Sequence, residues 1–219
     1  MDQTNEDKRR RAGIGKRGPG IDRRAFVGLL PALFLGPRAF AATEGKKVGR
    51  VESAAGAAFA RLTRTRPLKP EAEILLGDLV WTDARSRTSL VLDGGTGIHL
   101  GEKARLTIDR FVAAEGGTLV LGEGALVFDR AEDLPKIDVT VRTAFGLIGV
   151  RGTRFFCGPS RGVFGVFCER GAVVVEAAGI QRRLGPGDGV DIPAAGAPPS
   201  AVARWRAPRI AEAFASVLG

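Results

Sequence analysis

Side chains able to do chemistry are few in this sequence, and their spacing assembles no reactive site. The chain has one histidine, His99, and two cysteines, Cys157 and Cys168. A single histidine cannot form a histidine-rich metal site, and a nucleophilic serine or cysteine would have to use His99 as its base. His99 falls in a predicted strand, and the sequence contains no Cys-x-x-Cys motif. We therefore expect no catalytic residue and no metal site.

Carboxylates are a second possible source of catalysis, because a glycan hydrolase needs two facing acids. Asp109, Asp129, Asp138 and Glu176 are candidates, but nothing in their spacing pairs them. The sequence also has no glycine-rich phosphate loop, haem motif or iron–sulfur spacing, so we predict no cofactor. A non-enzymatic protein is the favoured interpretation, and a periplasmic hydrolase is the weaker rival.

The first 41 residues have the order of a twin-arginine export signal. A charged segment precedes Arg23-Arg24-x-Phe26, an apolar stretch follows, and a small-x-small cleavage site lies at Ala39 and Ala41. The apolar stretch is shorter than the ~20 residues that span a bilayer as a helix. We predict export by the twin-arginine translocase, cleavage of the signal, and a periplasmic location. A signal that escaped cleavage would instead hold the protein at the membrane.

The strongly basic character of the chain belongs largely to that signal. Residues 1–41 hold nine of the 33 Lys and Arg residues and four of the 24 Asp and Glu residues, so the rest carries a net charge of +4 rather than +9. No dense basic run with interleaved aromatic residues follows. A nucleic-acid partner is therefore not expected.

Short strand-like segments dominate the remainder of the chain, with turns every 8–12 residues or fewer. Ser89–Leu92 ends at Asp93-Gly94-Gly95, a strong hairpin signal, and Ile137–Arg142 alternates apolar and polar residues. Such spacing is typical of an all-β domain built from hairpins. We predict many short antiparallel strands over residues 42–193, arranged as two sheets or as a β-roll or solenoid.

A proline-rich strap and one short helix are predicted at the C-terminus, over residues 194–219. Pro208 suits the first turn of this helix, and the apolar side chains share one face. These side chains are Ile210, Phe214, Val217 and Leu218. We expect the helix to cover an open end of the β structure.

The two cysteines lie on either side of a predicted turn at residues 158–162. Pairing Cys157 with Val163 places Cys168 on the opposite face, and pairing it with Phe164 places Cys168 roughly 13 Å away at ~3.3 Å per residue. Bridged Cα atoms lie within about 7 Å of each other. Although the periplasm permits disulfides, two buried free thiols are favoured, and the oxidation of either thiol stays open.

Three blocks of the sequence together resemble the FecR domain of bacterial envelope proteins. They are Leu76-Gly77-Asp78-Leu79-Val80-Trp81-Thr82 with the following residues 84–96, then Ile98–Ile108, then Val141–Phe155. The third block is similar to the family signature T-P-x-[AG]-x-I-G-[IV]-R-G-T-x-F, with Ala144 where proline is usual. The resemblance spans roughly residues 47–193 and implies a FecR-like β domain.

The matching signature residues are expected to have structural or interaction roles. Glycines every three residues let a strand bend and let a neighbouring backbone approach closely. The Arg151 guanidinium is expected to hold loop carbonyls or a carboxylate of a neighbouring strand as a buried brace. A ligand-binding role for Arg151, and a surface patch formed by Arg142, Arg151 and Arg154, are the alternatives that stay open. The site residues of this motif are Gly146, Ile148, Gly149, Arg151, Gly152, Thr153 and Phe155.

The resemblance also bears on function. Better-known FecR proteins carry a cytoplasmic segment that engages a sigma factor, a membrane helix, and this domain facing an outer-membrane receptor. Here only 24 residues precede the apolar stretch, so direct sigma-factor contact is not expected. We predict a non-enzymatic adaptor or sensory module that binds an envelope protein, with exposed strand edges as one means of pairing. A cell-wall glycan-binding module and a structural envelope protein are the alternatives.

Overall fold

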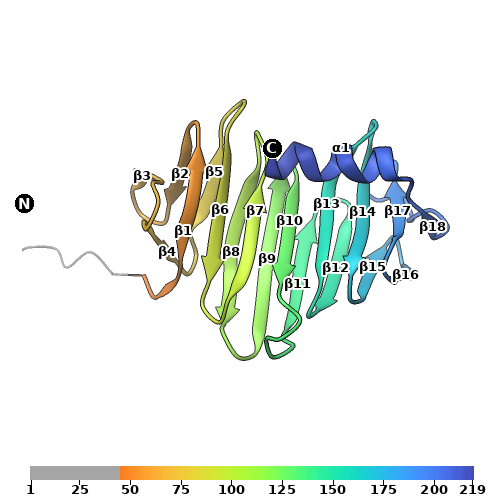
Figure 1. The fold of residues 1–219 in the computed structure, drawn as a ribbon, viewed down its shortest axis with the longest axis horizontal. Helices are drawn as coiled ribbons and strands as arrows, with labels where there is room; N and C mark the ends of the chain where they lie inside the picture. The colour runs from red at the N-terminus through yellow and green to blue at the C-terminus, as the bar shows by residue number, and fades with distance from the viewer. Residues whose placement is uncertain (1–44) are drawn as a thin grey trace, which may run out of the picture. The chain divides into compact units, whose positions relative to one another are not determined.

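The computed structural model describes residues 45–219, which form two nine-stranded sheets facing each other and one helix (Figure 1). Sheet A contains β1 (Lys47–Ala55), β4 (Glu73–Leu75), β6 (Arg87–Leu92), β7 (Thr96–Leu100), β10 (Leu126–Arg130), β13 (Arg154–Ser160), β14 (Val163–Arg170), β17 (Asp188–Ile192) and β18 (Ala203–Arg204). Sheet B contains β2 (Ala58–Arg61), β3 (Thr65–Pro67), β5 (Leu79–Thr82), β8 (Arg105–Val112), β9 (Gly116–Glu123), β11 (Asp138–Thr143), β12 (Gly146–Arg151), β15 (Val173–Ala177) and β16 (Ile180–Leu184). The predicted all-β fold with a short C-terminal helix is confirmed, and of the predicted arrangements the strands adopt two sheets.

The chain builds both sheets by alternating between them. From β6 onward it adds a hairpin to sheet A, then a hairpin to sheet B, with the single strand β10 as an exception. Because only one strand separates β9 from β11, the chain returns to sheet B in the same direction, and these two strands pair in parallel. All other paired strands are antiparallel, as the hairpin signals predicted.

Alternation along each strand places one set of side chains in the core between the sheets. Val139 and Val141 of β11 point inward with Ile148 and Val150 of β12, and their intervening residues face outward. Burying such side chains stabilises the fold by roughly 1.5–3 kcal/mol each. The period-two pattern therefore fixes which residues of sheet B reach the surface.

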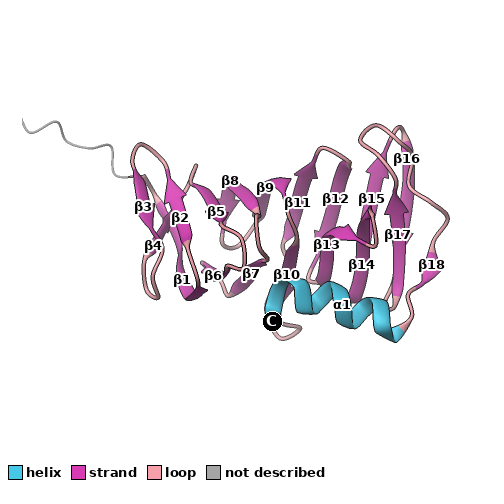
Figure 2. Cartoon of the chain, turned by 90° about the horizontal axis from the view of Figure 1, so that it is seen from above, coloured by secondary structure: helices cyan, strands magenta, loops and turns pink. Residues whose placement is uncertain are grey.

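A second apolar cluster lies on the outer face of sheet A, beneath helix α1 (Ala207–Leu218). Figures 1 and 2 show α1 running across β10, β13 and β14. Phe156 and Phe167 of sheet A contact Trp205 and Phe214 there. The expectation that α1 covers an open end is therefore wrong. β13 and β14 are apolar at consecutive positions, so both of their faces need cover.

The helix is held by one apolar face and by two ion pairs, one of which joins Glu212 of α1 to Arg161 in the turn between β13 and β14 at 2.8 Å. Phe214 and Val217 are buried and Ile210 is half-buried, but Leu218 is exposed, contrary to expectation. The Arg209 guanidinium lies 3.7 Å from the centre of the Trp205 ring and 2.6 Å from the carboxylate of Asp191 on β17. These contacts fix the helix on sheet A.

The register around the cysteines is neither of the two considered from the sequence, because the residue opposite Cys157 lies two positions beyond Phe164 and three beyond Val163. Arg161 and Gly162 form a two-residue turn with positive φ at both positions, so β13 and β14 extend further than expected. Cys157 lies opposite Val166, which makes Cys168 its diagonal neighbour on the same face, at about 7–8 Å. Both thiols are free and buried, as favoured from the sequence.

Candidate functional site

Most of the FecR-like signature residues serve the fold itself. Ile148 and Phe155 belong to the core, and Thr153 is buried. Gly152 has a φ of 62°, which favours glycine, and a side chain at Gly146 would clash with the backbone carbonyl of Glu176. The predicted roles of glycine in bending and close approach apply at these two positions.

Gly149 is different, because neither the backbone nor the packing requires a glycine there. Its φ is not in the left-handed region, and a Cβ atom at this position would meet nothing closer than the Val174 carbonyl oxygen at 3.9 Å. A glycine inside a strand weakens the strand and often marks a place where another backbone or a ligand approaches closely. Gly149 therefore leaves the outer face of sheet B without a side chain at this position, although the fold does not require a glycine there.

Arg151 lies on the same outer face and is not a buried brace. Its Nε is 3.7 Å from a carboxylate oxygen of Asp138 on the neighbouring strand β11, and the two side chains are 68% and 77% exposed. A neighbouring-strand carboxylate is indeed its partner, but an exposed pair at this distance contributes at most ~1 kcal/mol. The expected buried charged hydrogen bond at Arg151 is wrong.

A shallow groove runs over this part of the outer face of sheet B. It has a volume of about 640 Å³ and is lined by charged and polar residues, by small residues and by three valines. The charged members are Lys136, Asp138, Arg151 and Arg183, so the groove has an excess of positive charge. Gly149 forms part of its floor, which brings two signature residues, Gly149 and Arg151, into one concave surface.

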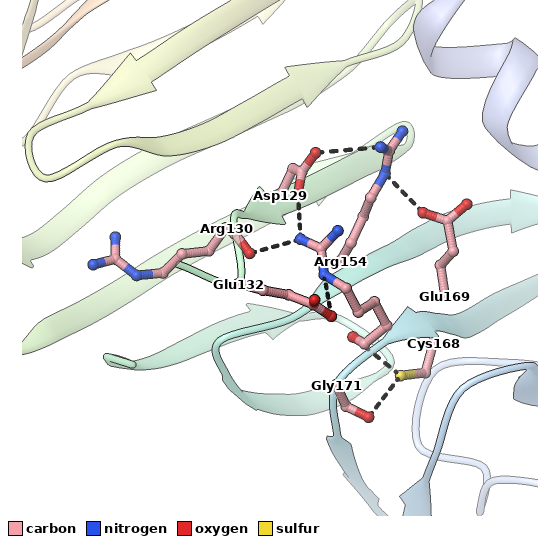
Figure 3. Close-up of polar contacts among 8 residues, drawn as sticks. Asp129, Arg130, Glu132, Arg154, Cys168, Glu169 and Gly171 are labelled. Carbon is pink, nitrogen blue, oxygen red and sulfur yellow. Dashed lines mark hydrogen bonds and ion pairs between the residues drawn. The ribbon is translucent and has the colours of Figure 1, made fainter. Parts of the chain in front are cut away.

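The bracing role falls instead to Arg154, on the outer face of sheet A. Its guanidinium lies 2.9 Å from Glu169 and 3.4 Å from Asp129 (Figure 3). It also lies 5.6 Å from the centre of the Phe214 ring of α1. Arg170 pairs with the same Asp129 at 3.1 Å. Asp129, a candidate catalytic acid from the sequence, is thus neutralised by two guanidinium groups and held within a structural network.

Arg130 is a buried cation that sequence reasoning missed. Its side chain points away from the Arg154 network (Figure 3) and is only 2% exposed. It donates hydrogen bonds to the carbonyls of Pro135 at 2.7 Å and Gly94 at 2.9 Å, and to the Thr96 hydroxyl at 2.7 Å. Burial lowers the pKa of its guanidinium. Nothing in its local sequence distinguishes it from an exposed strand-end arginine.

The remaining candidates for chemistry do not come together. Asp138 and Glu176 stand on β11 and β15 of sheet B with β12 between them, and Asp109 is exposed at a bulge in β8. His99 Nδ1 is 2.8 Å from the Ser89 hydroxyl on the outer face of sheet A. Burial lowers the pKa of His99, which favours its neutral form. Among residues 45–219, no group of three or more His, Cys, Asp or Glu side chains is placed to hold a metal ion.

No helix within the described part of the chain has the length and apolar character needed to cross a membrane. The twin-arginine signal residues Arg23, Arg24, Phe26, Ala39 and Ala41 lie outside the described residues.

Known proteins with a similar fold or sequence were found for this chain. Two crystal structures of a candidate anti-sigma factor from Parabacteroides distasonis ATCC 8503, at 1.65 and 2.50 Å resolution, are each 18% identical, with TM-scores of 0.49 and 0.50. Each match covers 60% of this chain and 62% of the other, and at this identity the likeness concerns the fold alone. No curated protein matches the sequence. Residues 78–174, which include the signature block with Gly149 and Arg151, match the family described as FecR protein.

Proposed function

We propose that this chain is a non-enzymatic FecR-domain binding module that contacts a protein of the bacterial envelope through the outer face of sheet B. One observation carries the proposal: the two sheets differ in what covers them. Helix α1 and an apolar cluster cover β10, β13 and β14 of sheet A. Over the described residues no element covers the outer face of sheet B, where the groove with Gly149 and Arg151 lies.

The rest of the proposal concerns location and role. The export signal at Arg23-Arg24 would send the domain across the membrane by the twin-arginine pathway. In the periplasm the domain is separated from sigma factors, so it would act on another envelope protein as an adaptor or sensor. The FecR match supports this regulatory role. The candidate acids are not paired with one another among the described residues, since Asp129 is bound by two arginines and Asp138 lies beside Arg151, which speaks for binding rather than catalysis.

Photo-crosslinking in the host cell tests this proposal. A benzophenone side chain is placed at Thr140, on the groove, and in a matched protein at Ser89, which is half-buried on β6 of sheet A. We expect one dominant adduct with an envelope protein from Thr140, identified by mass spectrometry, and none from Ser89. Equal adducts from both positions, or adducts from Ser89 alone, would remove sheet B as the binding surface.

A further inference from the structure

Arginines on the two sheets differ in whether they have partners within the protein. Each arginine on a strand of sheet A makes a hydrogen bond or an ion pair; these are Arg50, Arg87, Arg130, Arg154, Arg170 and Arg204. On the outer face of sheet B, four arginines make neither kind of contact with any residue of 45–219; these are Arg61, Arg110, Arg142 and Arg183. All four are exposed. The outer face of sheet B therefore presents cationic side chains that make no polar contact within the described part of the protein.

The strand register places two of these cations at the ends of one line that crosses the groove. The line runs from Arg110 on β8 to Arg183 on β16 through Thr118, Thr140, Gly149 and Val174. Five strand steps of ~4.8 Å separate its ends by roughly 24 Å. An extended polypeptide rises ~3.3 Å per residue, so about seven residues would cover this distance.

The neighbouring line of the sheet adds a third cation and an apolar side chain beside the groove. Arg142 of β11 lies opposite Leu147 of β12, and Leu147 is 43% exposed, one of the few large apolar side chains on the surface of the described residues. Glu176 lies opposite Leu147 on the other side, and Asp138 lies within the groove. A uniform polyanion would meet these two carboxylates unfavourably. A polypeptide with separate acidic and apolar side chains matches the mixed pattern better.

We propose that the outer face of sheet B binds an extended acidic polypeptide segment of the partner. Its carboxylates pair with Arg110, Arg142 and Arg183, and one of its apolar side chains packs on Leu147. Guanidinium groups suit this task because they bind carboxylates in a bidentate manner and are weakly hydrated. This inference rests on the proposed function and specifies the chemistry of its partner.

Charge reversal on the crosslinking protein tests the inference in the full chain. The face variant carries Arg110→Glu, Arg142→Glu and Arg183→Glu together with the benzophenone at Thr140. The control variant carries Arg64→Glu, Arg85→Glu and Arg206→Glu, which change the net charge equally at exposed arginines in turns and before α1. Both purified variants should melt within about 2 °C of the parent, since the replaced side chains are exposed and unpaired.

We expect the face variant to lose the Thr140 adduct by roughly tenfold or more, because rim charges of a complementary interface become repulsive. The control variant should keep the adduct within about twofold, and mass spectrometry of the adduct should find peptides of a second protein. An unchanged adduct in the face variant would overturn the acidic partner while leaving the binding surface in place. An adduct that a muramidase shortens and that contains no peptides of a second protein would replace the polypeptide with a cell-wall glycan. Absence of a Thr140 adduct in the parent would instead refute the proposed function.

Discussion

Arg130 offers the sharpest test of how this fold is held together. Its buried guanidinium joins the Gly94 turn between β6 and β7 to the loop at Pro135, and it also binds the Thr96 hydroxyl. No carboxylate of residues 45–219 forms an ion pair with it. Carbonyl and hydroxyl oxygens therefore compensate the buried charge. These oxygens lose their hydrogen-bond donor if the guanidinium is removed.

The expected cost of Arg130→Met follows from these three hydrogen bonds. Each buried acceptor left without a donor costs about 1–3 kcal/mol, and removing one partner of a buried charged contact costs about 3–5 kcal/mol in all. For a domain of this size, 1 kcal/mol corresponds to roughly 2–4 °C in melting temperature. We therefore expect Arg130→Met to lower the melting temperature by about 10 °C. The melting temperature of Arg130→Lys should fall between those of the parent and of Arg130→Met, because an ammonium group cannot reach all three acceptors.

Thermal and urea unfolding, followed by circular dichroism, measure this effect. Arg142→Met is the matched control, because Arg142 is exposed and makes no polar contact with the described residues; its free energy of unfolding should change by less than about 0.5 kcal/mol. A melting temperature for Arg130→Met within 2 °C of the parent would refute the reasoning that this buried cation fixes the two loops.

Four further outcomes are expected. Phe214→Ala should lower the free energy of unfolding by about 3 kcal/mol in urea, because it empties the cluster under α1; a loss below 1 kcal/mol would contradict that packing. Arg151→Ala should change the free energy of unfolding by no more than about 0.5 kcal/mol, and a larger loss would show that Arg151 does brace the fold. The folded pKa of His99 lies below its ordinary value of 6.5, so the stability that its neutral form contributes is complete above pH 6.5 and is lost as pH falls through the folded pKa. His99→Gln should weaken this pH dependence of the free energy of unfolding, measured by urea unfolding at several pH values. An unaltered pH dependence would count against the role of His99. Burial raises the pKa of the Cys168 thiol to about 11, and Cys157 is fully buried, so a thiol reagent should label neither before unfolding; fast labelling of either would show an accessible thiol.

Local patterns in the sequence were sufficient for the elements and the fold class. The alternation at Ile137–Arg142 and the Asp93-Gly94-Gly95 turn correspond to β11 and to the hairpin of β6 and β7. Period-two alternation depends on neighbouring residues alone, so it can be read without knowing the tertiary structure. The place of α1 could not be read this way, although the consecutive apolar residues of Val163–Cys168 indicate a strand covered on both faces.

The predicted roles of the arginines were partly wrong, because these roles depend on contacts between residues far apart in the sequence. Arg151 and Arg154 are three residues apart, but the chain passes from sheet B to sheet A between them. One side chain therefore reaches an exposed face and the other reaches the network beneath α1. The significance of Gly149 likewise needed the structure, because only the space around its Cα distinguishes it from the backbone-required Gly152.

Replacing that glycine tests the central claim, that sheet B binds the partner, most directly. Gly149→Val adds a side chain to the groove floor where the nearest atom to a Cβ is 3.9 Å away, and β-branched residues favour strands. The measurement is the amount of partner captured from the host by tagged Gly149→Val and parent proteins, alongside their melting temperatures. We predict strongly reduced capture with a melting temperature that is unchanged or higher. Full capture by a stably folded Gly149→Val protein would contradict the assignment of the binding surface to sheet B.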